Sequence, residues 1–449
     1  MAQQLPQSGL TGAAKLKAVT DLGIETLTKH AFNSSSATTS RNALRCLANS
    51  LLIKPETRQY FVDLGYEAKA CSKLKSGSFD DEFLVSRIIF LTTYGTNVNL
   101  QTLIDQHHLA DAIIQNIARH AKLWSSKPSS SGSGGNSPKT KARVDPMTDM
   151  ALTETAKLLF NVTHFCKDRV DAFTPAIAPI VTMICKHDTP QPKPLDPPLG
   201  PLVNALLTLN LTSEKGTAAL FPKSEPAALT ERLIQLLDLA LRKYPDTELD
   251  SAVLPLVTAL RKIYEFAPVE TVRPVMHAKL LPTEADRKKV LGKGDSLPSL
   301  ILKHTTNALA PEFRNSVSHM LFELSDKDAT KFVQNVGYGF ASGFLFQNNV
   351  PIPEGATETF RAAAAAEGGS GRAINAVTGQ FVDEETTPDI PEMTDEEKER
   401  EAERLFVLFE RLRKTGVVNV ENPIAQAARE GRLGNDVRDG KDRIEELDD

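Results

Sequence analysis

The amino-acid sequence predicts an all-α fold, and three observations support this prediction. Leucines recur at three- and four-residue spacing in the stretch RNALRCLANSLLI (Arg41 to Ile53), which is the pattern of one apolar helix stripe. Two later stretches, TAKLLFNVTHF and VNALLTLNLTS, repeat an amphipathic helix that ends in Leu-x-Asn or Leu-Asn. Only 6% of the residues are aromatic, whereas strand-rich proteins usually carry more aromatic and β-branched side chains. Repeated helical units of roughly 40 to 50 residues are typical of armadillo or HEAT stacking, so we expect a helical superhelix, or solenoid.

The first part of this solenoid begins with a helix at Leu16 to Ala31. In the next unit, Leu44, Leu47, Leu51 and Leu52 are predicted to form the apolar stripe. Acidic residues begin the helix expected at Asp80 to Tyr94, where the helix dipole favours them. The segment SSKPSSSGSGGNSPKTK has almost nothing to bury, so it predicts a disordered insertion at about residues 125–145. The helical segments expected after the first one are Arg41 to Ile53, Glu56 to Lys75 (one or two helices), Asp80 to Tyr94, Leu100 to Leu123 (one helix or a pair) and Pro146 to Lys167.

The second part of the solenoid follows a proline-dense break. The sequence HDTPQPKPLDPPLGP predicts an extended loop at about residues 188–201. Glycines between Gly337 and Gly343 resemble a nucleotide-binding loop, but helical patterns surround them, so a tight turn is the better interpretation. The body is therefore predicted to span residues 1–346. Its remaining helices are expected at Leu202 to Asn210, Ala228 to Tyr244, Ser251 to Phe266, Leu297 to Ala308, Pro311 to Leu324 and Lys331 to Phe346.

Residues 347–449 form a second, acidic region. From Gln347 onward there are 24 acidic and 13 basic residues, which leaves 33 acidic and 39 basic residues in the body. An acidic linker is expected first, then an amphipathic helix at residues 394–414, then a flexible charged tail. Thr394 and Glu397 match a capping box at the start of this helix. One face of the helix carries Leu405, Phe406, Phe409 and Leu412. This face either packs back on the body or docks on a partner, and periodicity leaves both open.

Composition argues against several functional classes. The net charge of −5 gives no reason to expect a nucleic-acid partner. The sequence has no stretch of eighteen uninterrupted apolar residues, so we expect no direct membrane insertion. The N-terminus lacks the apolar segment of a signal peptide. No serine lies in a strand-turn-helix elbow, so we expect no enzyme active site and no cofactor. The cysteines form no CxxC pair and match no common zinc spacing, so they are interpreted as reduced core residues of a cytosolic protein with no metal site: Cys46, Cys71, Cys166 and Cys185.

The asparagines in the repeated helices have two interpretations. In a right-handed solenoid the last helix of each unit lines the concave groove, where an asparagine can hydrogen-bond the backbone of a bound peptide. Alternatively, Asn49, Asn161 and Asn210 cap local helices or bond neighbouring loops.

Several motifs together resemble the synembryn family (resistance to inhibitors of cholinesterase). In order they are ALRCLANSLL, RIIFLTTYGTNV, AKLLFNVTHF, VNALLTLNL, FVQNVGYGFASGFL, INAVTGQ and MTDEEKEREAERLFVLFERLRKTGVV, which extend from about residue 40 to 420. The chain resembles a fungal-like member of this family. In animal members a further helical repeat precedes the first motif, and an acidic phosphorylatable run precedes the tail helix. Here GATETFRAAAAAEGGS stands in place of that run, so phosphorylation control is not expected.

The resemblance implies an exchange factor and folding chaperone for heterotrimeric G-protein α subunits, with no covalent chemistry. It implies a monomeric, cytoplasmic protein that reaches the plasma-membrane cortex through its partner. That partner is the α subunit, GDP-bound or nucleotide-free, whose C-terminal helix would lie in the concave groove while the tail helix contacts the nucleotide-binding domain. The groove positions that match the family are Asn49, Arg87, Phe90, Phe160, Asn161 and Asn204. The alternative function is a scaffold that binds peptides or helices without changing nucleotide affinity.

Overall fold

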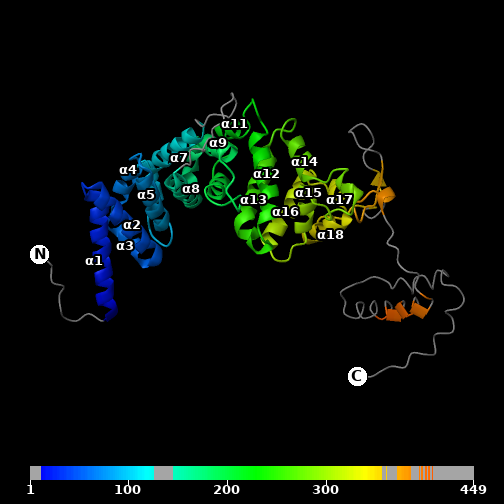
Figure 1. The fold of residues 1–449 in the computed structure, drawn as a ribbon, viewed down its shortest axis with the longest axis horizontal. Coiled ribbons are helices and arrows are strands. Elements are labelled where there is room, and N and C mark those ends of the chain that lie inside the picture. The colour runs from blue at the N-terminus through cyan, green and yellow to red at the C-terminus, as the bar shows by residue number, and fades with distance from the viewer. Residues whose placement is uncertain are drawn as a thin grey trace, which may run out of the picture. The chain divides into compact units, whose positions relative to one another are not determined.

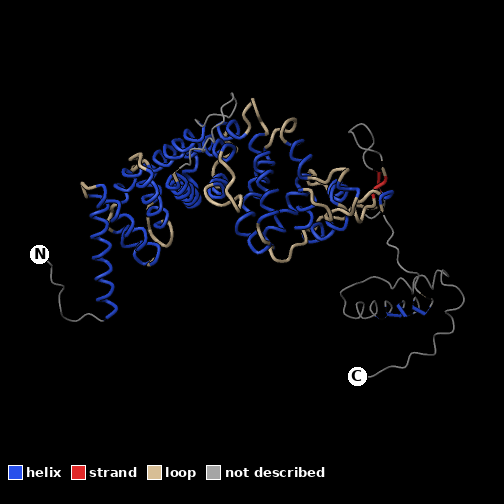
Figure 2. Tube along the Cα trace, in the orientation of Figure 1, coloured by secondary structure: helices blue, strands red, loops and turns tan. Residues whose placement is uncertain are grey.

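The all-α prediction is confirmed. The computed structural model describes residues 12–125, 145–355, 360–361 and 372–385, and single residues between 394 and 407. These residues contain eighteen α-helices and only two short strands, β1 (Phe360–Arg361) and β2 (Ala373–Ile374), which pair antiparallel. Contacts divide the chain into a first unit, residues 1–385, and a second unit, residues 386–449. Figure 2 shows how little of the first unit is strand.

Helices of the first unit stack in two rows. In the first row each helix packs on the next one in the series, although two or more elements separate most of them along the chain. This stacking in sequence order is what a solenoid predicts, and it can be followed in Figure 1. The first row consists of α2 (Ala37–Ile53), α5 (Phe79–Thr92), α8 (Pro146–Phe165), α10 (Leu199–Leu207), α13 (Leu254–Phe266) and α16 (Pro311–Leu324).

The second row packs along one side of the first. Its helices also contact one another in series: α4 (Glu67–Leu74), α7 (Leu109–Ser125), α9 (Ile177–Lys186), α12 (Ala228–Lys243), α14 (Arg273–Leu280) and α15 (Leu297–His304). The remaining helices begin the unit, connect the rows or end the unit: α1 (Gly12–Asn33), α3 (Glu56–Asp63), α6 (Leu100–Asp105), α11 (Glu214–Leu220), α17 (Ala329–Val336) and α18 (Tyr338–Gln347). None of the described helices is both long and apolar enough to cross a lipid bilayer.

The predicted leucine stripe of α2 is correct for three of its four leucines. Leu44, Leu47 and Leu51 are fully buried, whereas Leu52 is 44% exposed. Leu52 follows Leu51 directly and is therefore rotated by about 100° around the helix, away from the core. Cys46 precedes Leu47 and is exposed for the same reason, so its prediction as a core cysteine was wrong.

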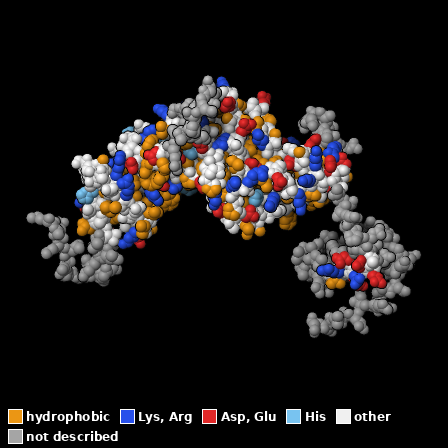
Figure 3. All heavy atoms as spheres, in the orientation of Figure 1, with side chains coloured by type: hydrophobic (Ala, Val, Ile, Leu, Met, Phe, Trp, Pro, Cys, Tyr) orange, Lys and Arg blue, Asp and Glu red, His pale blue; other side chains and the backbone are white. Residues whose placement is uncertain are grey.

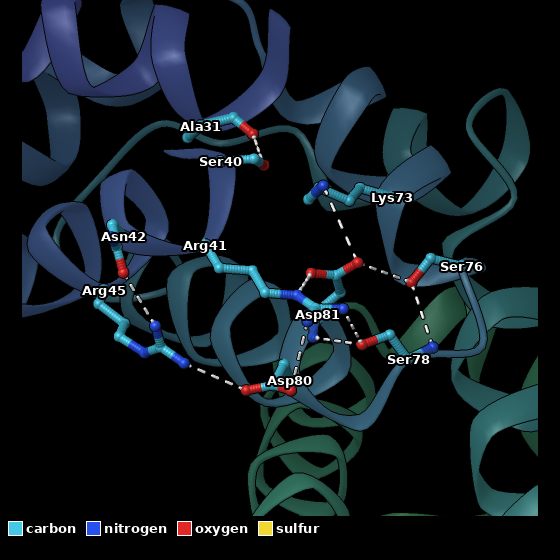
Figure 4. A network of polar contacts seen from close by, with 10 residues as sticks. All are labelled: Ala31, Ser40, Arg41, Asn42, Arg45, Lys73, Ser76, Ser78, Asp80 and Asp81. Atoms are coloured by element: carbon cyan, nitrogen blue, oxygen red, sulfur yellow. Dashed lines mark hydrogen bonds and ion pairs between the residues drawn. The ribbon is translucent and has the colours of Figure 1, made fainter. Parts of the chain in front are cut away.

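Polar contacts fix the register of α2 against α5. Ser78 caps α5 by accepting a hydrogen bond from the Asp81 amide, and the guanidinium of Arg41 donates to both Ser78 and Asp81. Arg45 of α2 pairs with Asp80 at 3.2 Å. Figure 4 shows these side chains meeting at the start of α5, where the acidic residues also suit the helix dipole.

A second polar network is buried between three helices. Glu82 of α5 is 1% exposed and accepts hydrogen bonds from Arg119 and His120 of α7 and from Thr155 of α8. Ser86 lies 3.1 Å from the same Thr155 hydroxyl. Because a buried carboxylate requires partners, this network specifies how α5, α7 and α8 fit together.

The structure contains elements that the sequence patterns did not indicate. The region between Phe165 and Pro190 holds a 3₁₀-helix, η1 (Lys167–Ala176), and α9. The π-helix η3 (Leu249–Val253) precedes α13. The helix expected at Lys331 to Phe346 is divided at Gly337, whose φ of +83° ends α17 before α18 begins. α10 begins at Leu199, inside the expected proline-rich loop. Of the insertion predicted at about residues 125–145, residues 126–144 lie outside the described residues.

The first unit does not end with its last helix. Residues 372–385, which the sequence pattern placed in the linker, bond to the start of α18 and to the loop after α14. This segment contains β2 and a 3₁₀-turn, η6 (Val382–Glu384). The first unit therefore continues beyond its last helix, through this docked extension, to Glu385.

Candidate functional site

A pocket of about 230 Å³ is lined by residues of three first-row helices, α5, α8 and α10, and of the turn after α5. We call it the aromatic pocket. It brings together four residues that the sequence analysis singled out: Phe90, Phe160, Asn161 and Asn204. Tyr94, Lys157 and Pro201 complete its lining.

Helical spacing explains why these residues meet. Phe90 and Tyr94 are four residues apart on one face of α5 and its C-terminal turn. Lys157 precedes Phe160 by three residues on α8, and side chains at this spacing are neighbours on a helix. Three consecutive helices of the first row thus present one face each to the pocket. Sequence analysis missed Tyr94, Lys157 and Pro201, although each lies three or four residues from a predicted site residue.

Aromatic rings extend the pocket along the surface. Tyr94 lies edge-on to Phe90 at 5.3 Å between ring centres and edge-on to Phe165 at 6.1 Å. His164 stacks parallel to Phe160 at 5.8 Å and contacts Phe165 at 5.0 Å. Tyr94 and Phe165 are 41% and 51% exposed, and contiguous exposed apolar rings of this kind mark an interaction surface. In Figure 3, hydrophobic side chains gather over the region of α5, whereas charged side chains are denser over α13 to α18.

The asparagines of the pocket have different roles. Asn161 is 2% exposed; its amide donates to the Thr93 hydroxyl at 2.7 Å, and its oxygen accepts from Tyr94 at 3.3 Å. It therefore ties α8 to the end of α5 and fixes the pocket wall. Asn204 is half-buried and forms no side-chain hydrogen bond with another described residue, so its amide can bind a ligand. Asn210, outside the pocket, donates to Asp171 on η1.

Positive charge lies beside the aromatic pocket. Arg87 precedes Phe90 by one turn on α5, and its guanidinium is 5.7 Å from the centre of the Phe83 ring. This half-buried guanidinium forms no ion pair with the described residues, whereas Lys157 is paired with Glu154 at 3.1 Å. Apolar rings, a free amide and a free guanidinium suit a peptide end that carries an apolar side chain and a carboxylate.

Asn49 does not belong to the aromatic pocket. It is exposed and lines a separate, mostly apolar pocket of about 380 Å³ between α1 and α2, with Ile24, Leu27 and Ile53 among its neighbours. The structure therefore does not bring Asn49 together with the other predicted groove residues.

A third, charged pocket of about 560 Å³ lies farther along the first row, at α13 and α16. Arg261 forms a two-bond contact with Glu323, and the Lys262 ammonium donates to the Leu207 carbonyl at the end of α10. Burial lowers the pKa of Lys262. These contacts hold α10, α13 and α16 together. The sequence analysis did not select these residues, because charged positions on helices are usually solvated.

The predicted tail helix is described only in part. Thr394 and Glu397 form the expected capping box: the Glu397 carboxylate accepts from the Thr394 amide at 3.0 Å, and the Thr394 hydroxyl accepts from the Glu397 amide at 3.3 Å. The apolar face predicted for this helix lies outside the described residues: Leu405, Phe406, Phe409 and Leu412.

Comparisons with known proteins agree with the sequence resemblance. A family model described as guanine nucleotide exchange factor synembryn matches residues 11–432. A synembryn-like chaperone of Schizosaccharomyces pombe is 24% identical over 384 residues, which cover 82% of this chain and 69% of the relative. The chaperone Ric-8A of Macaca fascicularis is 25% identical over 405 residues, covering 84% and 72% of the two chains. The Xenopus laevis chaperone Ric-8A is 29% identical over 216 residues, covering 45% and 37%.

Proposed function

Because the chain belongs to the guanine nucleotide exchange factor synembryn family, we propose that it is an exchange factor and folding chaperone for a heterotrimeric G-protein α subunit. The observation that carries this proposal is the aromatic pocket, in which Phe90, Phe160 and Asn204 from three consecutive helices converge beside Arg87. A monomer acting in the cytoplasm, and reaching the plasma-membrane cortex through its partner, completes the proposal.

The aromatic pocket would receive the C-terminal helix of the α subunit. An apolar side chain of that helix would enter between Phe90 and Phe160, since a concave site lined by rings and a few polar groups is the usual form of a ligand pocket. The free Asn204 amide would bind the peptide backbone, and Arg87 would pair with a carboxylate.

Exchange then follows from linkage and needs no covalent step. If the protein binds the nucleotide-free α subunit more tightly than the GDP-bound form, its binding must weaken the α subunit's affinity for nucleotide by the same factor. Binding of GTP in turn releases the protein. The same preference for an open, incompletely folded partner accounts for a chaperone activity, as the names of the relatives indicate for those proteins.

Peptide binding tests the pocket. Affinity would be measured by fluorescence anisotropy with a labelled peptide copied from the C-terminal helix of a G-protein α subunit. Arg87→Ala and Asn204→Ala should each weaken binding by roughly 5- to 150-fold, corresponding to about 1–3 kcal/mol for one lost contact. Arg242→Ala is the matched control, because Arg242 forms an exposed ion pair with Asp238 on α12 in the second row. Equal affinities for Arg87→Ala, Asn204→Ala and the control, with helical circular dichroism retained, would remove this pocket from the binding site.

GDP release separates an exchange factor from a scaffold. The groove alone can hold a helix, but faster release also requires differential affinity for an opened nucleotide domain, which we assign to the tail helix and its predicted apolar face. A chain that ends at Glu385 keeps the docked extension and loses the tail helix. We expect this shortened chain to bind the peptide with unchanged affinity but to accelerate GDP release from the α subunit only weakly. If the shortened chain accelerates GDP release from the α subunit as much as the full-length protein does, the two-contact mechanism is contradicted. If the full-length protein binds the peptide but does not accelerate GDP release, the scaffold function is favoured.

A further inference from the structure

Residues 372–385 are the docked extension described above, and we call them the strap. Backbone hydrogen bonds join the strap to the end of the solenoid. The Tyr338 amide at the start of α18 donates to the Ala376 carbonyl at 2.7 Å, and the Gly339 amide donates to Val377 at 3.2 Å. In the loop after α14, the Leu291 amide donates to the Thr378 carbonyl at 3.2 Å. The strap therefore joins two parts of the body that are separated by almost fifty residues in sequence.

Arg287 is the central side chain of this junction. It is 8% exposed, and its guanidinium donates to the Gly379 carbonyl of the strap at 2.9 Å and to the Gln334 and Asn335 carbonyls of α17 at 2.8 and 3.0 Å. The backbone carbonyl of Arg287 accepts a hydrogen bond from the Phe381 amide of the strap at 2.9 Å. One buried residue thus binds the strap from both its side chain and its main chain, and hydrogen bonds to a charged donor are the stronger kind.

The strap fits its position closely. Gly379 has a φ of +67°, and a Cβ at this residue would lie 2.3 Å from Leu291 Cδ1. The strap also passes close to Gly337, where a Cβ would be 3.3 Å from the Gly379 amide nitrogen. A larger residue at Gly379 would therefore push the strap off the body as well as strain its own backbone.

Further contacts stabilise the strap, some within it and some with the body. Arg372 lies 4.0 Å above the Phe381 ring and pairs with Asp383 and Glu384 at 2.6 and 3.0 Å. Gln380 is 8% exposed, and its amide donates to the Lys288 carbonyl at 3.2 Å. Buried donors and acceptors are satisfied across the junction, which is the property of a built interface.

Docking of the strap limits how far the capped start of the tail helix can be from the body. From Glu385 to Thr394 the chain has nine peptide steps, so it spans at most about 30 Å whatever its conformation. Without docking, the last residue held by the body would be Val350, whose amide donates to the Leu345 carbonyl, and the 44 steps to Thr394 would allow about 150 Å.

We propose that the strap is a positioning device for the C-terminal region, and that Arg287 and Gly379 are the residues that hold it. This inference rests on the proposed function, because the tail helix supplies the second contact with the α subunit. Effective concentration falls with about the −3/2 power of connection length. Undocking lengthens the connection from 8 residues (386 to 393) to 43 residues (351 to 393), so the second contact should become roughly 12-fold less available.

The test uses two full-length variants that undock the strap from opposite sides. Gly379→Val changes the strap, and Arg287→Ala changes the body. Gly343→Ala on α18 is the matched control, because a Cβ there meets nothing within 4 Å. Hydrogen exchange of the Tyr338 and Leu291 amides reports docking, the labelled peptide from the partner reports the groove, and GDP release reports the second contact.

We expect both variants, but not the control, to exchange the Tyr338 and Leu291 amides at least tenfold faster and to lose about tenfold in stimulated GDP release. Peptide affinity should stay within twofold of the wild type. Two results would overturn the proposal: undocked variants that still accelerate GDP release at the wild-type rate, or Tyr338 and Leu291 amides that remain protected in both variants. If wild-type protein accelerates no GDP release, the proposed function fails with it, which distinguishes that outcome from failure of the strap alone.

Discussion

Removal of the Glu82 carboxylate should destabilise the first unit more than removal of any surface carboxylate. Glu82 accepts hydrogen bonds from Arg119, His120 and Thr155 while itself only 1% exposed. In Glu82→Ala all three donors lose this acceptor, and two of them, His120 and Thr155, are fully buried. Breaking a buried charge pair by removing one partner typically costs about 3–5 kcal/mol, and this is the effect we expect.

Thermal and urea unfolding followed by circular dichroism measure this effect. With an unfolding entropy of about 2.1 cal/mol/K per residue, a cooperative unit of about 370 residues changes by about 0.8 kcal/mol per degree, so Tm should fall by about 4–6 °C. Asp80→Ala is the control, because Asp80 lies in the same helical turn but is one-third exposed in its ion pair with Arg45. That pair should contribute at most about 1 kcal/mol. Equal losses in the two variants would refute the reasoning.

The pH dependence gives an independent check on Glu82. Burial alone would raise its pKa, but the hydrogen bond and charge of His120, with Thr155 and Arg119, outweigh burial and hold the pKa below its ordinary value of 4.5. A carboxyl group with a lowered folded-state pKa contributes stability above pH 4.5 and loses that contribution as the pH falls through the folded value. The stability difference between wild type and Glu82→Ala should therefore be constant from pH 7 to about 5 and shrink below about 4.5. A difference that grows on acidification would contradict this assignment.

Three further predictions concern single side chains. In native protein a thiol reagent should label exposed Cys46 and spare Cys71, because burial raises the pKa of Cys71 to about 12; peptide mass spectrometry would identify the labelled site, and equal labelling would contradict the packing of α4. Phe61→Ala should cost about 3–5 kcal/mol in urea unfolding, since this fully buried ring leaves a cavity, and a cost below about 1 kcal/mol would show that the site collapses. Asn161→Ala should cost about 1–3 kcal/mol by removing the hydrogen bonds of Asn161 to the Thr93 and Tyr94 hydroxyls, and it should also weaken peptide binding; an unchanged midpoint would count against the Asn161 anchor.

Local sequence determined the helices and much of the candidate site. Apolar spacing located the buried stripe of α2, and the capping residues located the start of the tail helix, because both signals arise within one or two turns. Four pocket residues could be selected from helix faces and family motifs, and the same helical spacing would also have indicated Tyr94 and Lys157.

Tertiary structure alone decided what those residues contact. No local signal showed that Asn161 would hydrogen-bond Thr93 and Tyr94 at the end of α5, while Asn204 forms no side-chain hydrogen bond with a described residue. Asn49 shares the pattern of the other asparagines, but it lies beside α1, because its surroundings depend on which helix packs next to α2. The strap was assigned to a linker because it lies in the acidic region after Gln347. It is held by backbone groups and by Arg287, 92 residues earlier than Gly379, and hydrogen bonds between backbones so far apart leave no periodicity in the sequence.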